Sequence, residues 1–283
     1  MRNNQDRLGA VPGGENPPIQ QPQQAEQPLQ FVTPTEFVEL PSRGKFYPEG
    51  HPLHNVETIE IRHMTAKDED ILTSTALLRK GIAIDRLLRN VIVDRSVNIA
   101  DLLVGDKNAL ILATRVTGYG PDYEASVSCP SCTSSVNFEF DLNQCHITPH
   151  DRHKEHDIVL TGDNTFIIHV DKLDLDVEVR LLTSKDEIEM LQLSERKRKK
   201  KLPESHLTDQ LRRIIVSVSG NIDRHYIESF IQAMPALDSR KLRSIYQNVV
   251  PNVNMDQEFV CSECSYEGEV SVPFGANFFW PKR

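Results

Sequence analysis

The chain has 283 residues, enough for one or two domains with a sizeable core. Its 32 Lys and Arg against 41 Asp and Glu give a net charge of −9, which disfavours non-specific binding to nucleic acid or to an anionic membrane as its main activity. No stretch approaches the ~20 apolar residues that span a bilayer, and the N-terminus lacks the apolar segment of a secretory signal. We therefore expect a protein of the reducing cytosol whose partners are other proteins.

Residues 1–30 form a Pro- and Gln-rich segment with almost no large apolar side chain. Such a segment cannot bury enough surface to offset the entropy lost on ordering, so we expect an extended arm that is disordered when free. Two interpretations stay open at this point. The arm is either a passive tail or a segment that becomes ordered on a neighbouring subunit.

The next region, residues 31–122, is predicted to have an α+β structure. Apolar periodicity indicates one strand followed by three helices, over residues 56–62, 65–81, 84–92 and 102–116. A capping box of Thr65 and Asp68 begins the first helix, and Gly81 ends it. We expect the aliphatic side chains of these elements to form core, and the acidic residues of the first turn to complement the helix dipole.

Residues 143–255 are predicted to form an inserted α+β region with C-terminal helices. It begins with a polar, His-rich connection, and strands are expected over 165–170 and 177–181 before a helix that begins at Thr183. Helical spacing then runs from Leu207 to Gly220, and further N-caps are expected at Asp223 and Asp238. The basic run Arg196–Lys201 indicates a solvated loop or helix end. No internal repeat is apparent beyond two cysteine hairpins.

The cysteines carry the strongest local pattern. Four of the five form two CxxC pairs, Cys129 with Cys132 and Cys261 with Cys264. Each pair lies between strand-like flanks, so each is expected in the turn of a β-hairpin. Four thiolates at one tetrahedron are the preferred structural site for zinc. Because the pairs lie much further apart than the ~15 to 20 residues of a compact ribbon, we predict a discontinuous zinc ribbon, residues 123–142 and 256–275, that holds one structural zinc and no catalytic one.

Other interpretations of the cysteines stay open. A thioredoxin-like redox pair needs a CxxC at the start of a helix, whereas both pairs here lie between strands. A zinc-dependent nucleobase deaminase needs H-x-E before P-C-x-x-C, and the nearest match, His153-Lys154-Glu155, comes after a pair. Two mixed metal sites would also use the remaining cysteine and nearby histidines: Cys145, His146, His150, His153 and His156. Without such sites, these histidines belong to a solvated linker and Cys145 is a spare thiol.

No sequence pattern supports an enzyme. The chain has no G-x-x-x-x-G-K-[ST], G-x-G-x-x-G, H-E-x-x-H or G-x-S-x-G. It therefore lacks the sequence support for a phosphate loop, a dinucleotide site, a zincin or a hydrolase elbow. We expect a structural or binding protein without catalytic residues or a small-molecule substrate.

A set of short motifs extends over most of the chain after residue 31. They are Glu39-Leu40-Pro41-Ser42-Arg43-Gly44 with Tyr47, Met64–Leu72, Leu102–Asn108, Tyr119-Gly120 leading into Cys129-Pro130-Ser131-Cys132, the second cysteine pair, and Phe278-Phe279-Trp280-Pro281. Together they resemble the baseplate hub and hub-assembly proteins of T-even-like contractile-tailed phages. The Pro- and Gln-rich arm and the basic run are not part of this resemblance and look like additions to the family's pattern.

The resemblance implies a structural or assembly component of a contractile phage tail baseplate, in the hub region. It implies contacts with other baseplate and hub proteins, a place in the host cytoplasm during assembly, and then the baseplate of the virion tail. It leaves open whether the chain is a permanent subunit or an assembly chaperone. The aromatic ending, Phe278, Phe279 and Trp280, either packs on the chain's own core or docks in a partner's pocket.

The expected fold class is therefore α+β, with helical segments, a discontinuous zinc ribbon of two CxxC β-hairpins, and an N-terminal arm that is disordered or ordered by a partner. An alternative function of a different class is a zinc-ribbon nucleic-acid-binding protein that uses the basic run 196–201. Salt-dependent binding to DNA would distinguish this alternative from the first interpretation.

Overall fold

The computed structural model describes residues 32–148, 150–156, 158–274 and 278–279. From Thr33 onward the chain forms one compact unit, and it mixes helices and strands as the sequence predicts. The arm of residues 1–30 lies outside the described residues. The division of the chain into regions 31–122, 123–142 with 256–275, and 143–255 stays a prediction.

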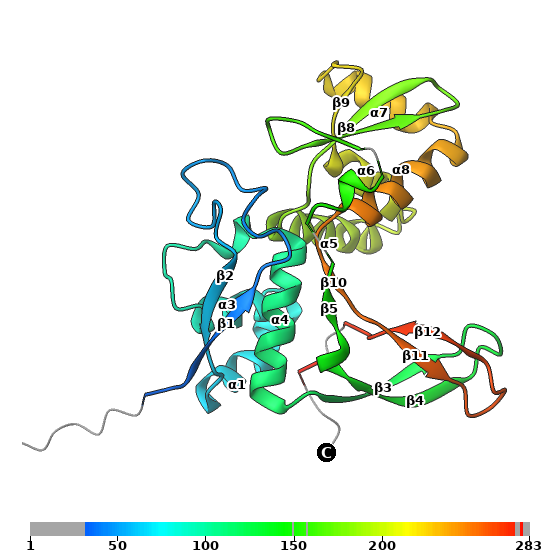
Figure 1. Cartoon of the computed structure of the whole chain (residues 1–283). Coiled ribbons are helices and arrows are strands. Elements are labelled where there is room, and N and C mark those ends of the chain that lie inside the picture. The colour runs from blue at the N-terminus through cyan, green and yellow to red at the C-terminus, as the bar shows by residue number, and fades with distance from the viewer. Residues whose placement is uncertain (1–31, 149, 157, 275–277, 280–283) are drawn as a thin grey trace, which may run out of the picture. The chain divides into compact units, whose positions relative to one another are not determined.

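The first part of the compact unit combines a two-stranded antiparallel sheet with a group of helices (Figure 1). Its elements are β1 (Thr35–Glu39), β2 (Thr58–Arg62), α1 (Ala66–Thr73), α2 (Thr75–Arg79), α3 (Ala83–Val91), the 3₁₀ helix η2 (Ile99–Asp101) and α4 (Val104–Tyr119). The helix expected over 65–81 is interrupted at Ser74, whose backbone is extended, and so forms α1 and α2. Gly81 follows α2 with φ +68°, a conformation that favours glycine after a helix.

Two antiparallel hairpins carry the cysteine pairs. The first joins β3 (Asp122–Ser128) to β4 (Ser135–Asp141), and the second joins β11 (Asp256–Val260) to β12 (Glu267–Ser271). Short elements follow the first hairpin: η3 (Leu142–Gln144), β5 (His146–Ile147) and η4 (Arg152–Lys154). β5 pairs with β10 (Val253–Asn254), which leads into the second hairpin. This pairing brings together two hairpins that are far apart in the sequence.

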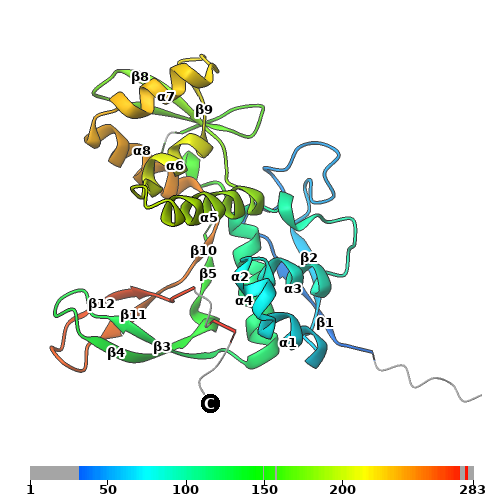
Figure 2. The same cartoon turned by 180° about the vertical axis from the view of Figure 1, so that it is seen from behind.

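The chain between the hairpins forms an antiparallel sheet in the order β6-β7-β8-β9, with helices packed on it (Figure 2). Its elements are β6 (Val159–Leu160), β7 (Phe166–Val170), β8 (Leu175–Val179), α5 (Ser184–Lys199), α6 (His206–Ile214), β9 (Ile215–Val218), α7 (Arg224–Ala233) and α8 (Ala236–Val249). α8 contacts β7, while α6 and α7 contact β9.

Two details of this region differ from the prediction. Helical spacing continues to Gly220, but α6 ends at Ile214, because the β-branched residues that follow favour a strand and pair with β8. Asp223 caps α7 as expected and accepts two backbone N–H hydrogen bonds, at 2.8 and 2.9 Å. Asp238 does not cap a helix. It is buried in the first turn of α8 and accepts two backbone N–H hydrogen bonds from the β7–β8 turn, both at 3.1 Å.

The structure contains an internal repeat, which corrects the expectation of none beyond the two cysteine hairpins. Residues 59–69 have the sequence IEIRHMTAKDE, and residues 177–187 have the sequence VEVRLLTSKDE. Both segments run from the second strand of an antiparallel pair into a helix, β2 into α1 and β8 into α5. We call residues 35–93 the first repeated unit and residues 166–218 the second repeated unit.

The two repeated units share a strand arrangement and a hydrogen-bond network. In each unit the second strand is also paired along the edge that faces away from the first strand. Ile61 of β2 pairs with Ile92, and the equivalent residue of β8, Val179, pairs with Ile215. Arg62 binds both oxygens of Asp68, at 2.7 and 3.0 Å, and Arg180 binds both oxygens of Asp186, each at 2.7 Å. In both units the helix-capping Thr donates its N–H and its hydroxyl to that carboxylate, at 2.8 to 3.0 Å. These bonds fix the angle between strand and helix.

The Asp68 carboxylate is expected to contribute to stability in a pH-dependent way. Burial raises its pKa, but the bonds from Arg62 and Thr65 outweigh burial and lower the pKa to about 2. Because the folded-state pKa lies below the unfolded value, the contribution is full above about pH 4 and is lost between about pH 4 and pH 2. We expect Asp68→Asn to lower the free energy of unfolding by ~2 kcal/mol at pH 7 and far less at pH 2, measured by urea titration. Asp70→Asn, at an exposed site of α1, is the control, and equal losses at both pH values would contradict the expectation.

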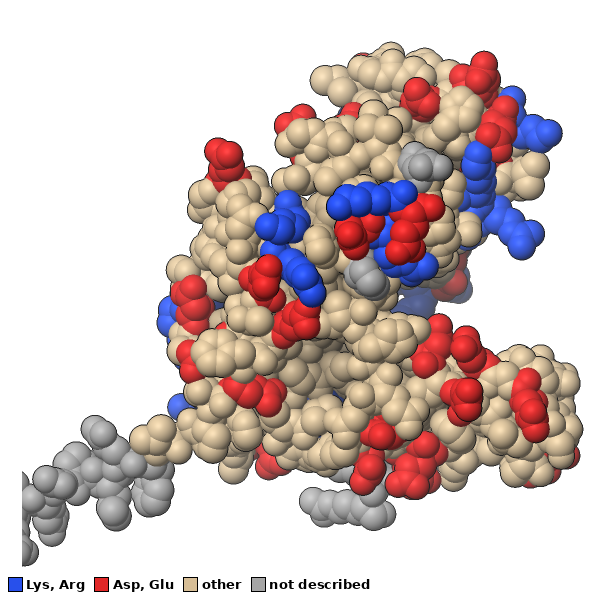
Figure 3. All heavy atoms as spheres, in the orientation of Figure 1, with Lys and Arg blue, Asp and Glu red and all other residues tan. Residues whose placement is uncertain are grey.

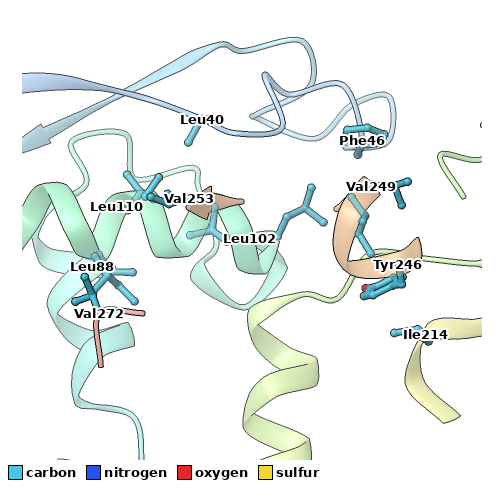
Figure 4. Packing of buried hydrophobic residues seen from close by; sticks show 14 of the residues in the cluster. Leu40, Phe46, Leu88, Leu102, Leu110, Ile214, Tyr246, Val249, Val253 and Val272 are labelled. Atoms are coloured by element: carbon cyan, nitrogen blue, oxygen red, sulfur yellow. The ribbon is translucent and has the colours of Figure 1, made fainter. Parts of the chain in front are cut away.

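The buried hydrophobic side chains of the described residues form one continuous cluster. Its members come from both repeated units, from α8 and from the C-terminal strands (Figure 4). The labelled side chains are Leu40, Phe46, Leu88, Leu102, Leu110, Ile214, Tyr246, Val249, Val253 and Val272. The expectation that the helical aliphatic residues form core is confirmed for α1, α3 and α4. It is wrong for α2, which has no buried residue and exposes Leu78.

A buried polar cluster docks the loop after β1 onto the start of α4. Asp106, which is 1% exposed, accepts hydrogen bonds from the Ser42 hydroxyl at 2.6 Å, the Ser42 N–H at 2.9 Å and the Tyr47 hydroxyl at 2.8 Å. The Tyr47 oxygen accepts the backbone N–H of Leu103 at 3.0 Å. Burial raises the pKa of Asp106, although these bonds act in the opposite direction. These residues belong to the motifs quoted for the phage resemblance, and here they hold the fold together.

Candidate metal centre

Each cysteine pair lies in a turn with the same backbone pattern. The Cys129 N–H donates to the carbonyl of Ser134 at 2.9 Å, and the Cys129 carbonyl accepts the N–H of Thr133 at 3.0 Å. The corresponding two bonds around Cys261 both measure 2.9 Å. Thr133 and Ser265 occupy the same position in the two turns, with φ of 60° and 55°. The hairpins therefore present their cysteines in equivalent ways.

The four sulfur atoms converge between the two hairpins. All four Sγ atoms lie within 4.8 Å of one another, with Cys129 3.7 Å from Cys264 and Cys132 3.8 Å from Cys261. A disulfide requires an S–S distance near ~2.05 Å, so these are free thiols. Four sulfurs at ~2.3 Å from a central zinc would stand about 3.8 Å apart in a tetrahedron. The donor set and its spacing fit a closed four-thiolate zinc site.

Contacts beside the sulfurs join the hairpins. Phe138 of β4 and Phe259 of β11 pack edge to face, with ring centroids 5.3 Å apart. Gln257 bonds the backbone of Asp141 twice: its Nε2 donates to the carbonyl at 2.8 Å, and its Oε1 accepts the N–H at 3.2 Å. Cys129 and Cys261 are 1% and 2% exposed, whereas Cys264 is exposed. One side of the cluster is therefore shielded from solvent, and the other side, at Cys264, is exposed to it.

The pKa values of two of the cysteines are shifted in opposite directions. Hydrogen bonds from the Ser134 side chain and backbone lower the pKa of Cys132 to about 6. The Tyr266 N–H lowers the pKa of Cys264, but burial and hydrogen bonding among the neighbouring sulfurs outweigh it and raise that pKa to about 12. Cys132 therefore ionises more readily than Cys264. A bound divalent metal stabilises all four as thiolates.

The surface of the two hairpins is acidic. Their charged residues are all Asp or Glu: Asp122, Glu124, Glu139, Asp141, Asp256, Glu258, Glu263, Glu267 and Glu269. Figure 3 shows this acidic surface at the lower right, over the hairpins that Figure 1 labels. The basic run Arg196–Lys201 lies elsewhere, at the end of α5. Within it, Lys197 forms an ion pair with Asp209 at 2.5 Å, and the other basic side chains are exposed.

The fifth cysteine and the nearby histidines do not join the metal centre. Within the described ranges, the only group of three or more His, Cys, Asp or Glu placed to hold a metal is the four-cysteine cluster. Burial raises the pKa of Cys145, whose sulfur accepts a hydrogen bond from Gln257 at 3.7 Å. His153 is buried beside Phe166, with ring centroids 5.8 Å apart. The structure thus places the Cys145 thiol outside the four-cysteine cluster.

Phe278 and Phe279 pack on the chain's own core, each 1% exposed. The Phe278 ring lies edge-on to Tyr123 at 5.2 Å, and its carbonyl accepts the Arg115 Nε–H at 2.8 Å. The buried Arg115 guanidinium also binds two carbonyls at the end of α4 and the start of β3, at 2.6 and 3.0 Å. The predicted docking of these two rings in a partner's pocket is therefore corrected, because the core covers them. Trp280 lies outside the described residues.

A comparison with protein families matches residues 33–280 to the family described as T4 bacteriophage base plate protein. The match spans both repeated units and both cysteine hairpins. Comparisons with curated proteins and with solved structures returned no match.

Proposed function

The chain belongs to the family of T4 bacteriophage base plate proteins, and on this premise we propose that it is a structural or assembly component of the baseplate hub stabilised by one zinc ion. The family supports a structural role in the phage baseplate. The hub location and the zinc are the finer parts of the proposal. They rest on the hub-protein motifs and on the four-cysteine cluster.

The four-cysteine cluster is the observation that carries the zinc proposal. Its sulfurs come from two hairpins that region 143–255 separates in the sequence, so a metal bound there cross-links the chain across that region. Cys129, Cys132, Cys261 and Cys264 would supply the four ligands. A closed site of four thiolates leaves no position for water or substrate, so the zinc would supply folding free energy and not catalysis.

The expected partners are other baseplate proteins, and the expected location is the virion tail after assembly in the host cytoplasm. Among the described residues, no helix is long and apolar enough to cross a membrane. A structural family favours a non-enzymatic role. The nucleic-acid alternative is less favoured, because the hairpins of the proposed ribbon carry only acidic charges and would repel phosphates.

The proposal predicts that this chain is found in purified, infectious particles. Quantitative mass spectrometry should detect it at a fixed number of copies relative to a known tail protein. Presence in infected cells but absence from particles would support a transient assembly factor and contradict a permanent subunit. Absence from both the particles and the tail assembly intermediates would contradict the baseplate role itself.

A further inference from the structure

Strand β1 has an unpaired outer edge. β2 covers one side of β1, and within the described part of the chain no strand pairs with the other side. The Pro34 carbonyl accepts the His63 N–H, and the Leu40 N–H donates to the Glu57 carbonyl. In an antiparallel ladder the backbone N–H and C=O groups of successive residues point to opposite sides of the strand. The backbone groups of residues 36 and 38 therefore point toward β2. The N–H groups of Thr35, Phe37 and Glu39 therefore point to the open edge.

The second repeated unit shows how the equivalent edge is covered. In the β1–β2 register Val38 lies opposite Ile59, and in the β7–β8 register Ile168 lies opposite Val177, so β1 corresponds to β7. The outer edge of β7 is paired with β6, which lies opposite Phe166 and Ile167. In the first unit, the strand equivalent to β6 is missing from the described residues.

The reason for the difference lies in the turn before the strand. β6 reaches β7 through a tight turn at 161–165, in which Thr161 N–H donates to Thr165 carbonyl at 2.8 Å and Asn164 has φ 60°. Before β1 the chain has Val32-Thr33-Pro34, without the Gly-Asp-Asn that forms the turn before β7. The chain therefore lacks the tight turn that would return the adjacent segment onto β1, so a strand at this edge has to come from a more distant part of the arm or from another molecule.

An apolar groove of about 310 Å³ borders this edge. Its floor is α4, through Ala109, Leu112, Ala113 and Val116. β1 contributes Glu36, Val38 and Glu39, and residues of η3, β5 and β10 complete the lining. Glu36 is half-buried and forms no ion pair with the described residues. The groove thus offers an apolar floor, open N–H groups at its edge, and the Glu36 carboxylate beside Glu39, which pairs with Arg43. Together these features suit an extended segment with apolar and basic side chains.

We propose that residues 1–11 of a second copy of this chain add to the open edge of β1 as a β-strand. The arm precedes β1 in the sequence, and its 30 residues can reach roughly 100 Å when extended. Proline lacks the N–H that a ladder needs, and the arm has prolines from Pro12 onward but none before it. In a strand, Arg7 and Val11 share one face of this Pro-free segment. With that face toward the groove, Arg7 can pair with Glu36 and Val11 can contact the apolar floor.

Phe37→Pro is the variant that tests this pairing. It removes one outward N–H from β1 and leaves the bonds to β2 in place, since Phe37 is 71% exposed and its N–H faces the open edge. Phe37→Ala is the matched control, because it removes the ring and keeps the N–H. The probe is a labelled synthetic peptide of residues 1–31, titrated by fluorescence anisotropy into the chain that starts at residue 32. A peptide of residues 12–31 is the second control.

We expect peptide 1–31 to bind saturably, Phe37→Pro to bind it at least about tenfold more weakly, and Phe37→Ala to bind within about threefold of the unmodified chain. Peptide 12–31 should not bind. The intact chain should self-associate in sedimentation velocity, and the chain without the arm should not. If Phe37→Pro fails to fold, Ala113→Arg on the groove floor serves in its place. Equal binding by both Phe37 variants, a monomeric intact chain, or self-association without the arm would each overturn the proposal.

Discussion

Cys129→Ser is expected to lose the bound metal and to destabilise the chain strongly. The substitution removes one of four thiolates from a closed site, and a serine hydroxyl does not replace a thiolate as a zinc ligand. Structural zinc sites contribute directly to folding, so we expect a loss of about 3 kcal/mol or more and a fall of about 10 °C in the midpoint of thermal unfolding. Zinc content by elemental analysis should fall from one ion per chain to a small fraction, and chelation of the unmodified chain should lower its midpoint similarly.

Cys145→Ser is the matched control for this experiment. Cys145 is half-buried and lies near the second hairpin, through its contact with Gln257, but it lies outside the sulfur cluster. A serine oxygen can accept the same hydrogen bond. This variant should keep one zinc per chain and nearly the full midpoint. If Cys129→Ser retained full zinc and melted with the unmodified chain, the shared four-thiolate site would be wrong.

The two hairpin turns that carry the cysteines were predictable because each depends on a local pattern. A CxxC between two strand-like segments indicates a hairpin turn by itself, and two such turns supply one tetrahedral donor set. The pairing that brings the hairpins together was not predictable in the same way. It depends on β5 and β10, two-residue strands that pair His146–Ile147 with Val253–Asn254 and are too short to show a period.

The helical block shows where local patterns fail. Helical spacing and strand propensity conflict over Ile215–Val218, and the conflict is resolved by pairing with β8, a tertiary contact. The burial of Phe278 depends on a residue far away in the sequence, the buried Arg115, whose guanidinium binds the Phe278 carbonyl. No periodicity near residue 278 indicates that bond.

The internal repeat was detectable in the sequence and was missed. The shared R-x-x-T-x-K-D-E pattern of residues 62–69 and 180–187 is short, and the loops on either side differ in length. The structure shows that the pattern marks two equivalent units, because Arg62 binds Asp68 in the same way as Arg180 binds Asp186. The repeat is a repeated helix-capping pattern, which the hydrophobic periodicity of the chain does not display.

Gly105→Ala is expected to destabilise the chain by about 3 kcal/mol or more, although Gly→Ala within a helix ordinarily stabilises by ~0.5 to 1 kcal/mol. Gly105 lies in the first turn of α4, and a Cβ there would stand 1.9 Å from the carbonyl oxygen of Pro251 and 2.9 Å from its carbonyl carbon. Both atoms are backbone and cannot rotate away. The clash therefore separates α4 from the segment that leads into β10, where Asn108 now donates to Asn252 at 3.1 Å.

Gly162→Ala isolates this clash from the general effect of the substitution. Gly162 has no heavy atom within 4 Å of the added Cβ, so its change in the free energy of unfolding by urea should stay within ~0.5 kcal/mol. Because β10 leads into the second cysteine hairpin, Gly105→Ala should also weaken zinc retention during chelator titration, while Gly162→Ala should leave it unchanged. Equal stability of the two variants would mean that α4 and the 251–252 segment are not packed as closely as the structure places them.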